Sequence, residues 1–509
     1  MPVASRSPWA ILFVLAGALA LISLDNTIVN VALPTLQEEL GASTAELQWV
    51  VDAYSVLFAG TLLLAGSLGD RFGRRRALVI GLIIFGAGSL AAGFASTADL
   101  LILCRAVMGI GGAFIMPSTL SILVQVFADP RARAQAIGIW AAVAGAAVAI
   151  GPILGGLLLE YTTWHAIFWV NPPLVVLALI ATLALVPESR DPSKPRLDPL
   201  GAILSTVGLV AFVVTVIEVP DRGITALTVT STLTAIVFLA AFVWWERRAP
   251  RPMLPMELFR NRLFTIAIVT VALVYGALMG VLFFLPQFLQ LVQGDSPLES
   301  GVAMLPAAGG LFAASLFSPR WAERFGTRRV VVAGLVLVVA GLAWSAWLTA
   351  DSSYLHVGGS LGLMGLGLGM VLPQATNAVL ASVPRERAGM GSAVNDGVAE
   401  LGGSLGVAVL GSLLSLGYRS EIEAQIVAAG DAITSIPAGV VDAVRESLAA
   451  GSLAVAQLPA DIATPIREVA GAAFVSGMAT ALMAAAGIVA AGALLAWWLF
   501  PARVERVEE

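Results

Sequence analysis

A long series of apolar runs is the feature that most limits what this chain can fold into. A helix needs about 20 apolar residues to cross a hydrocarbon core roughly 30 Å thick. We expect spanning helices at 9–33, 47–67, 77–96, 99–124, 134–159, 165–187, 198–218, 223–245, 263–291, 298–318, 329–350, 354–382, 388–416 and 468–499. Because every backbone group inside lipid must be hydrogen-bonded within the protein, these fourteen runs predict an all-α integral membrane protein.

The composition agrees with a lipid environment and excludes several kinds of chemistry. Of the 509 residues, 58% are hydrophobic and 12% are charged, which is too few charges to cover a water-exposed surface. Cys104 is the only cysteine, so neither an internal disulfide nor a thiolate metal site can form. The sequence has no paired nucleophile and base and no glycine-rich phosphate loop followed by lysine. We therefore expect no enzyme activity, cofactor, metal or nucleic-acid partner, and a proton gradient as the energy source.

The positive charges indicate the orientation of the chain. With the N-terminus placed inside, most of the 28 lysines and arginines fall in the inner loops. Basic loops resist translocation, so we expect both termini to be cytoplasmic in a bacterial-type cytoplasmic membrane. The first apolar run is long enough to span, and we interpret it as an uncleaved helix and not as a signal peptide.

Two sequence segments recur about half a chain apart. Asp-Arg-Phe-Gly-Arg-Arg-Arg at 70–76 returns as Glu-Arg-Phe-Gly-Thr-Arg-Arg at 323–329, and a glycine-rich segment ending in proline at 111–117 returns at 367–373. A repeat of this kind predicts two six-helix halves, a plan that many secondary transporters share. The expected parts are an N-terminal half at 1–187, two inserted helices with cytoplasmic linkers at 188–262, and a C-terminal half at 263–509.

Residues 418–467 form an extracytoplasmic segment in this arrangement. The segment mixes apolar and acidic residues at helix-like spacing. A short amphipathic hairpin against the outer face and a partly ordered loop both fit this pattern.

The loop between the second and third helices combines glycines with charges. Its relevant residues are Gly66, Gly69, Asp70, Arg71, Gly73, Arg74 and Arg75. Glycines let the chain turn sharply between packed helices, while Asp70 can bond helix ends and arginines of its own loop or of the other half. We expect such contacts to act as a gate on the cytoplasmic side. A loop that only sets topology would explain the arginines but not the glycine spacing.

Two ionisable residues lie at similar depth inside apolar runs, Asp25 in the first and Arg105 in the fourth. A charge inside the membrane is costly and is by default a functional hypothesis. A long guanidinium can bridge the two depths and form a pair whose strength depends on protonation of the carboxylate. The alternatives are a carboxylate satisfied by Asn26 or Asn30, and an arginine that extends to the outer interface.

A second pair of ionisable residues, Asp396 and Glu400, lies four residues apart on one face of the thirteenth helix. Two buried carboxylates repel when both are ionised, so at least one proton is retained and their titrations are coupled. They are candidates for a second proton site or for attracting a cationic substrate, and a structural pair bonded to Asn395 is the alternative. Asp52 lies at the outer start of the second helix, where the interface can hydrate it.

The fifth apolar run carries Gly145, Gly151, Pro152, Gly155 and Gly156. Small residues four apart allow close contact between helices, and the proline removes one backbone hydrogen bond. A kinked and closely packed helix suits a seam that moves, although ordinary packing would also explain the glycines.

Taken together, these motifs resemble the fourteen-helix drug:proton antiporter branch of the major facilitator superfamily over essentially the whole chain. The 66–76 loop resembles the superfamily's cytoplasmic signature, 24–34 the helix-one motif, 105–113 the intramembrane arginine motif, and the fifth run the motif of exporters. The chain departs from the branch at Met108, where glutamine is usual, and at 399–400, where an arginine–glutamine pair is usual.

The resemblance implies the major facilitator fold and alternating access by rocking of the two halves. A monomer would exchange inward proton flow for outward movement of small amphiphilic, often cationic compounds. With the first, fourth, ninth and twelfth helices around the cavity, its candidate residues are Asn26, Asn30, Tyr275, Met279, Phe283, Phe284, Gln374 and Asn377. Methionines and aromatic rings tolerate varied ligands, and carboxylates favour cations. A dedicated exporter of one metabolite, antibiotic or lipid is the alternative, and a non-transporting receptor or scaffold is the alternative of another class.

Overall fold

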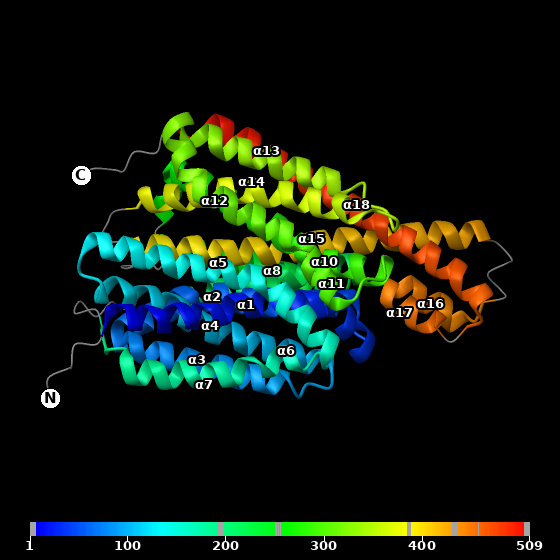
Figure 1. The fold of residues 1–509 in the computed structure, drawn as a ribbon, viewed down its shortest axis with the longest axis horizontal. Helices are drawn as coiled ribbons and strands as arrows, with labels where there is room; N and C mark the ends of the chain where they lie inside the picture. The colour runs from blue at the N-terminus through cyan, green and yellow to red at the C-terminus, as the bar shows by residue number, and fades with distance from the viewer. Residues whose placement is uncertain are drawn as a thin grey trace.

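The computed structural model of the protein describes residues 7–190, 198–249, 252, 254, 256–383, 388–429, 436–456 and 458–502. In this part of the chain 14 spans are long and apolar enough to cross a membrane, which confirms the predicted all-α membrane fold (Figure 1). The elements are α1 (Pro8–Leu40), α2 (Thr44–Phe72), α3 (Arg74–Ala92), α4 (Ala98–Val126), α5 (Pro130–Tyr161), α6 (Ala166–Trp169), α7 (Asn171–Leu185), α8 (Pro199–Arg222), α9 (Ala226–Glu246), η1 (Met256–Arg260), α10 (Arg262–Gln287), η2 (Phe288–Val292), α11 (Pro297–Ala303), α12 (Leu305–Phe325), α13 (Thr327–Ser345), α14 (Tyr354–Ala381), α15 (Ala388–Ala429), α16 (Ala438–Glu446), α17 (Leu448–Val455) and α18 (Ala460–Leu499). Three spans consist of two consecutive elements: α6 with α7, α10 with η2, and α11 with α12.

The two ends of the bundle differ in structure. Helix α1 begins and α18 ends at one end, which we call the terminal end (Figure 1). At the opposite end α15 and α18 extend beyond the other helices, with α16 and α17 between them in the sequence; we call this the hairpin end. An even number of spans requires that the first helix begin and the last helix end on the same side.

Helices α16 and α17 are held against the bundle by buried hydrogen bonds. Tyr418 Oη of α15 donates to the carbonyl oxygen of Val444 at 2.6 Å, and Gln37 Nε2 of α1 donates to Ser447 Oγ at 2.9 Å. The described residues of 418–467 therefore form an ordered helical hairpin and not a partly ordered loop. Residues 430–435 and 457 of this segment lie outside the described residues.

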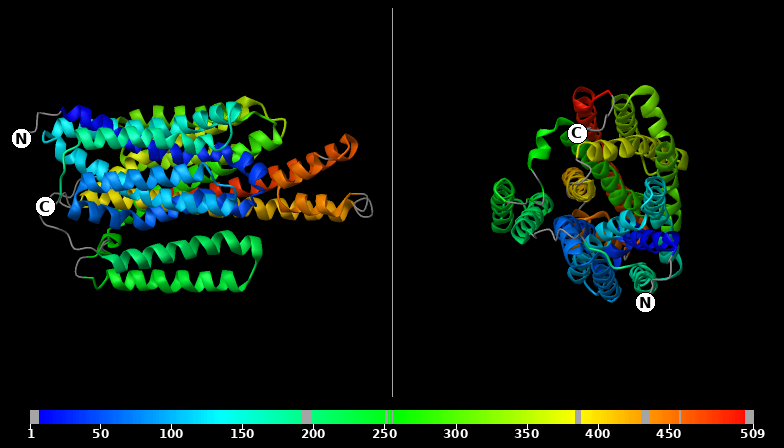
Figure 2. Two further views of the ribbon diagram at one scale, coloured as in Figure 1. Left: turned by 90° about the horizontal axis from the view of Figure 1, so that it is seen from below. Right: turned by 90° about the vertical axis from the view of Figure 1, so that its left-hand side faces the viewer.

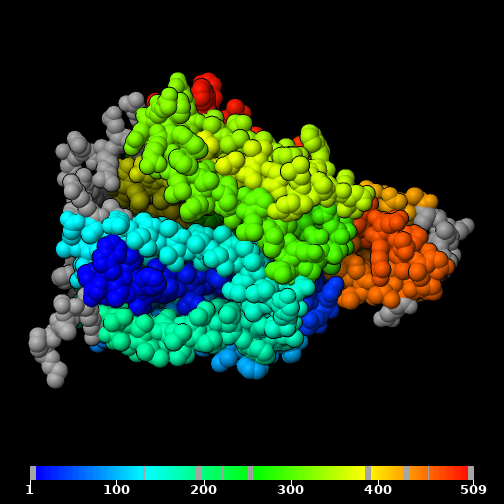
Figure 3. All heavy atoms as spheres, in the orientation of Figure 1, coloured from blue at the N-terminus to red at the C-terminus, as the bar shows by residue number. Residues whose placement is uncertain are grey.

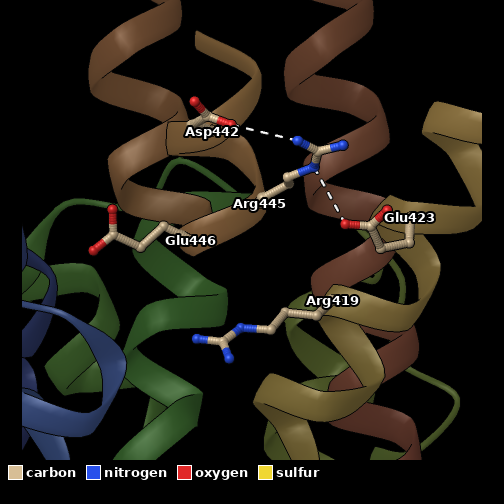
Figure 4. A pocket seen from close by; sticks show the side chains of 5 residues that line it. All are labelled: Arg419, Glu423, Asp442, Arg445 and Glu446. Atoms are coloured by element: carbon tan, nitrogen blue, oxygen red, sulfur yellow. Dashed lines mark hydrogen bonds and ion pairs between the residues drawn. The ribbon is translucent and has the colours of Figure 1, made fainter. Parts of the chain in front are cut away.

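The hairpin also carries an open, charged pocket of about 290 Å³ (Figure 4). Arg445 of α16 is ion-paired with Glu423 of α15 at 3.2 Å and with Asp442 at 3.4 Å. Arg419 and Glu446 complete the lining. The pair with Glu423 joins α16 to the extension of α15, outside the main bundle, and the pair with Asp442 lies within α16.

Small residues bring helix backbones into direct contact inside the bundle. A Cβ atom on Gly406 of α15 would lie 2.0 Å from the carbonyl oxygen of Gly276 in α10. One on Gly109 of α4 would lie 2.2 Å from the carbonyl oxygen of Tyr54 in α2. Any side chain at these glycines would push the paired helices apart.

The two copies of the repeated loop have similar backbone geometry. Gly73 ends α2 with a φ of 128°, and Gly326 ends α12 with a φ of 89°, a region that favours glycine. Each loop also places an arginine over the following phenylalanine ring, at 5.4 Å for Arg71 and 5.3 Å for Arg324. The sequence repeat therefore corresponds to a repeated local structure.

Helices α8 and α9 form a pair beside the bundle (Figure 2). Helix α8 contacts both α2 and α15, while α9 packs against α8. Thr206 Oγ1 of α8 donates to the carbonyl oxygen of Gly60 in α2 at 2.9 Å, and Ser412 Oγ of α15 donates to that of Val216 in α8 at 3.3 Å. The apolar part of this contact is the buried cluster of Val56, Val213, Ile217 and Ala408.

The substitution Gly406→Ala tests the crossing of α10 and α15. The added methyl group would overlap the backbone of Gly276, and overpacking typically costs about 1–3 kcal/mol. We expect a lower midpoint of thermal unfolding in detergent. Gly145→Ala on α5 is the matched control, because nothing lies within 4 Å of a Cβ atom there. Equal midpoints for the two variants would contradict the backbone contact.

Candidate functional site

The centre of the site is an ion pair between α1 and α4. Asp25 and Arg105 are 1% and 0% exposed, and Arg105 Nη1 donates to Asp25 Oδ2. Arg105 Nε donates to the carbonyl oxygen of Val50 at 3.0 Å, and the guanidinium lies 4.6 Å from the ring centroid of Tyr54. Nη2 of the same guanidinium has no hydrogen-bond partner among the described residues. The arginine is therefore held inside the protein and does not extend to the interface.

Sequence reasoning missed the neutral residues that orient Asp25. Asn171 Nδ2 donates to Asp25 Oδ1 at 2.8 Å and lies 3.0 Å from Ser89 Oγ. Ser89 Oγ in turn donates to the carbonyl oxygen of Phe168 at 2.8 Å. Asn171 is placed by the break between α6 and α7, where two prolines start the new helix. The sequence signal that points to Asn171 is an asparagine directly before two prolines in the middle of an apolar run.

A second set of polar contacts joins the N-terminal helices to α15. Glu400 accepts a hydrogen bond from Asn26 Nδ2 at 3.3 Å and one from Ser55 Oγ at 3.0 Å. Asp396 accepts from Asn395 Nδ2 at 3.1 Å and from Ser392 Oγ at 3.4 Å, within its own helix. The structural alternative of a bond to Asn395 thus applies to Asp396 and not to Glu400.

The two sets of polar residues are neighbours in space. Asn26 follows Asp25 on α1 and donates to Glu400, so the carboxylate of Glu400 lies beside the helix that carries Asp25. Tyr54 lies within electrostatic range of Asp25, Arg105 and Glu400 together. Both Glu400 and Asp396 are partly exposed, whereas Asp25 is fully buried. Arg105 therefore pairs with the buried carboxylate of Asp25, and the partly exposed carboxylate of Glu400 lies nearby.

Asp52 lies deeper than its place in the sequence indicates. The outer interface could have hydrated it, but it is 0% exposed because it lies more than two turns inside α2, against α15. Ser404 of α15 is a neighbouring polar side chain, and neither carboxylate oxygen makes a well-formed hydrogen bond among the described residues. With Gln48, which donates to backbone carbonyls of α15 at 3.4 Å, and Ser55, it forms what we call the polar ladder of α2.

The predicted cavity residues on α10 do not all face the site. Tyr275 is partly exposed and lies within electrostatic range of Asp396 and Glu400. Met279, Phe283 and Phe284 are instead 8%, 0% and 1% exposed and belong to the main apolar core. Packing explains these three residues without a ligand.

The remaining cavity candidates, Asn30, Gln374 and Asn377, do not lie beside the carboxylates. Asn30 is buried and donates to the carbonyl oxygen of Asn26 at 3.2 Å, so its side chain satisfies its own helix. Gln374 is buried and donates to Ser318 Oγ of α12 at 3.0 Å. Asn377 is exposed. Of the eight candidates, Asn26 and Tyr275 lie beside the carboxylates.

The glycine-rich loop makes its charge contacts within the N-terminal helices. Arg74 Nε is paired with Asp70 at 2.8 Å and its Nη1 donates to Gln125 of α4 at 3.1 Å. The backbone N–H of Arg75 donates to Glu188 at 3.1 Å. A Cβ atom on Gly73 would lie 2.7 Å from the same carboxylate. Among the described residues no hydrogen bond or ion pair links this loop to helices α10–α18.

The other glycines of this loop also face helices of the same group. A Cβ atom on Gly69 would lie 3.2 Å from Ala77, and one on Gly66 would lie 3.5 Å from Pro117 of α4. Of the two sequence alternatives, contacts within the loop's own half and contacts with the other half, the structure has the first.

The glycines of α5 pack against two different neighbours. Cβ atoms on Gly151 and Gly155 would lie 2.0 Å from Thr27 Oγ1 and 2.9 Å from the carbonyl oxygen of Ile28, both in α1. One on Gly156 would lie 2.4 Å from the carbonyl oxygen of Pro297 in α11. A Cβ atom on Gly301 of α11 would lie 2.4 Å from the carbonyl oxygen of Pro152 in α5. Close packing explains these residues, but Gly145 has no such neighbour.

The double variant Asp25→Asn/Arg105→Gln tests whether the buried pair acts as a unit. Removing one partner of a buried ion pair typically costs about 3–5 kcal/mol, because the other charge is left uncompensated. We expect Arg105→Gln alone to unfold at a lower temperature than the double variant in detergent at neutral pH. If the single variant is as stable as the double variant, Asp25 carries no charge that depends on Arg105.

Comparison with known proteins agrees with this architecture. Residues 15–407 match the family model of the Major Facilitator Superfamily. The multidrug efflux pump LfrA of Mycolicibacterium smegmatis is 38% identical over 97% of both chains. The methyl viologen resistance protein SmvA of Salmonella typhimurium is 34% identical over 81% of this chain and 84% of its own.

Further relatives and solved structures show the same likeness. The multidrug resistance protein Stp of Mycobacterium tuberculosis is 35% identical over 95% of this chain and 90% of its own. A crystal structure of a bacterial homologue of the human lysosomal transporter Spinster, inward-facing and unoccupied, has the same fold, with a TM-score of 0.67, 18% identity and 97% of each chain covered. The chain therefore belongs to the Major Facilitator Superfamily and is a multi-pass membrane transporter, not an enzyme, related to drug and antibiotic efflux pumps.

Proposed function

We propose that this transporter is a proton-coupled antiporter that exports small amphiphilic, often cationic compounds by alternating access. The observation that carries the proposal is the buried Asp25–Arg105 pair beside the accessible carboxylates of α15. A carboxylate whose partner depends on its protonation state is suited to coupling an ion gradient. The names of the relatives support the substrate class, since three describe multidrug efflux or resistance to methyl viologen, a dication.

The moving parts are the N-terminal half at 1–187 and the C-terminal half at 263–509, with 188–262 inserted between them. The matching geometry of Gly73 and Gly326 supports the repeat. Glu400 supports a site at the interface of the halves, because its hydrogen-bond donors Asn26 and Ser55 come from the other half.

The coupling step is an exchange of charge partners at Arg105. Protonation of Asp25 removes the charge that holds the guanidinium, and the unbonded Nη2 can then turn toward Glu400. A cationic substrate at Glu400 competes with Arg105 for the same carboxylate. Proton uptake at Asp25 therefore promotes release of the cation, and each state of Asp25 biases the rocking equilibrium differently.

The arrangement of contacts corresponds to the inward-facing state in this proposal. The halves meet through the polar ladder of α2 and through the contact of α5 with α11 near the hairpin end, whereas the glycine-rich loop makes no hydrogen bond or ion pair with α10–α18 among the described residues. The terminal end is then cytoplasmic, as the distribution of arginines indicates. The loop of 66–76 would close this side when it gains partners in the other half.

A dedicated exporter of one compound remains the second candidate. The tetracenomycin C resistance and export protein of Streptomyces glaucescens, 35% identical over 80% of this chain, is named for a single compound. Transport of a panel of structurally unrelated cations separates the two candidates, since a dedicated exporter would accept few of them.

The orientation is tested with two accessible tags. A tag inserted within residues 418–467, beside the exposed Ala428, should be labelled from outside intact cells, and a tag after Pro501 only from inside. The second position borders residues 503–509, which lie outside the described residues. Labelling of both tags from the same side would contradict an even number of spans.

The variant Asp25→Asn tests coupling. It keeps the shape of the side chain and mimics the protonated state, so we expect it to fold but to lose uphill efflux of a cationic dye in proteoliposomes with an imposed pH gradient. Glu218→Gln on α8 is the matched control, because Glu218 is also buried and paired, at 2.7 Å with Arg222, but lies outside the site. Wild-type accumulation by Asp25→Asn would place coupling elsewhere.

The variants Asp396→Asn and Glu400→Gln test the substrate side of the site. Each removes the negative charge that attracts a cation and leaves a neutral amide of the same shape, whose oxygen can still accept a hydrogen bond. We expect transport of cationic compounds to fall several-fold while transport of neutral compounds changes little. If both variants transport cations as wild type does, the two carboxylates have a packing role.

A further inference from the structure

The two halves meet along two seams that are counterparts under the sequence repeat. The repeat makes the α11–α12 span the counterpart of α2, and α15 the counterpart of α5. One seam is therefore α2 with α15, and the other is α5 with α11 and α12. The helices that form the two seams also differ in overall burial: in the most apolar stretch of α2 and of α15, 61% of the residues are buried, against 28% for α5 and for the α11–α12 span.

The α2–α15 seam is closed by polar side chains near the hairpin end, and α15 still approaches α2 at Gly397, where a Cβ atom would lie 3.5 Å from Leu62. The polar ladder of Gln48, Asp52 and Ser55 contacts α15 over two turns. Helix α8 then covers the seam from the lipid side, because it bonds α2 through Thr206 and α15 through Val216. A compound dissolved in the bilayer meets α8 and α9 on this side of the protein.

The α5–α12 seam is closed only near the hairpin end. There α5 touches α11 at Gly156 and Pro152. Gly145 and Gly138 lie on the same face of α5, because each is about two helical turns further toward the terminal end than the residue before it in the series Pro152, Gly145 and Gly138. Nothing lies within 4 Å of a Cβ atom at either glycine, nor at Gly309 of α12.

The surface is hollowed where these helices separate. Figure 3 shows a recess between α5 and α12 toward the terminal end, with α15 behind it. Helix α15 carries the partly exposed Asp396, and the side chains of Phe312 and Leu316 on α12 are 60% and 55% exposed. The recess thus lies beside a helix with exposed apolar side chains and in front of the helix that carries a carboxylate.

We propose that this recess is a lateral opening through which amphiphilic cations pass from the leaflet at the terminal end to the carboxylates of α15. Helix α8 makes the access one-sided, because it closes the counterpart seam. A lipophilic cation can keep its apolar part in the acyl chains while its charge moves toward Asp396, which avoids full transfer into water. This inference rests on the proposed export of amphiphilic compounds and adds the route that they take.

The experiment uses cysteines at the two seams in the full-length protein. Cys104 is the only cysteine and is buried, so Cys104→Ser supplies the background. Gly145→Cys lies in the open seam, and Thr206→Cys lies in the contact of α8 with α2. Each variant is reconstituted in proteoliposomes and treated with pyrene maleimide, which partitions into the bilayer. Gly138→Cys provides a second position in the open seam.

We expect Gly145→Cys and Gly138→Cys to be labelled and Thr206→Cys to remain unlabelled. Labelling of Gly145→Cys should slow transport of tetraphenylphosphonium, a lipophilic cation, several-fold, and leave transport of water-soluble methyl viologen unchanged. Equal labelling of both seams, or equal slowing of both substrates, would overturn the lateral route.

The labelling pattern does not require transport, so it is separable from the proposed function. If the unlabelled background variant fails to transport any cation against a proton gradient, the proposed function fails, whatever the labelling pattern. If it transports cations and labelled Gly145→Cys moves tetraphenylphosphonium at the unlabelled rate, the lateral opening alone is refuted.

Discussion

An arginine buried in the middle of a membrane protein needs a counter-charge and several acceptors, and the Asp25–Arg105 pair is built around that requirement. Desolvating two ions is costly, and the cost is offset only where geometry and hydrogen bonding are good. Here Val50, Tyr54 and Asn171 supply a backbone acceptor, an aromatic face and a donor to the carboxylate. The pair is therefore stable in one protonation state and weakened in the other, which is the property a coupling site needs.

In the proposed mechanism the same pair links local chemistry to the movement of the halves. Asp25 and Asn26 are adjacent on α1, yet one bonds within the N-terminal helices and the other bonds Glu400 on α15. A change of charge at Asp25 therefore occurs next to Asn26, whose side chain bonds Glu400 across the interface of the two halves. The glycine contacts of α5 with α1 and α11 keep the backbones close near the hairpin end, so that the halves can pivot there.

The spans and the pairing of Asp25 with Arg105 could be predicted because both depend on one-dimensional features. The length of an apolar run sets a span, and the depth of a charge within its run limits its partners. Lateral packing between distant segments leaves no such local signal. Asp52, which the outer interface could have hydrated, is buried against α15, and Phe283 and Phe284, which were candidates for the cavity, lie in the apolar core. The position of α8 over the α2–α15 seam was likewise not readable from its own sequence.

The central claim is that cation binding and proton binding compete through Arg105, and it can be measured without transport. Purified wild-type protein in weakly buffered detergent solution at neutral pH is mixed with a saturating cationic substrate, and the pH is followed with an indicator dye. We expect protons to be released on binding. A cation bound at Glu400 leaves Arg105 paired with Asp25, and this ion pair disfavours protonation of Asp25. Binding confirmed by calorimetry with no proton release would contradict it.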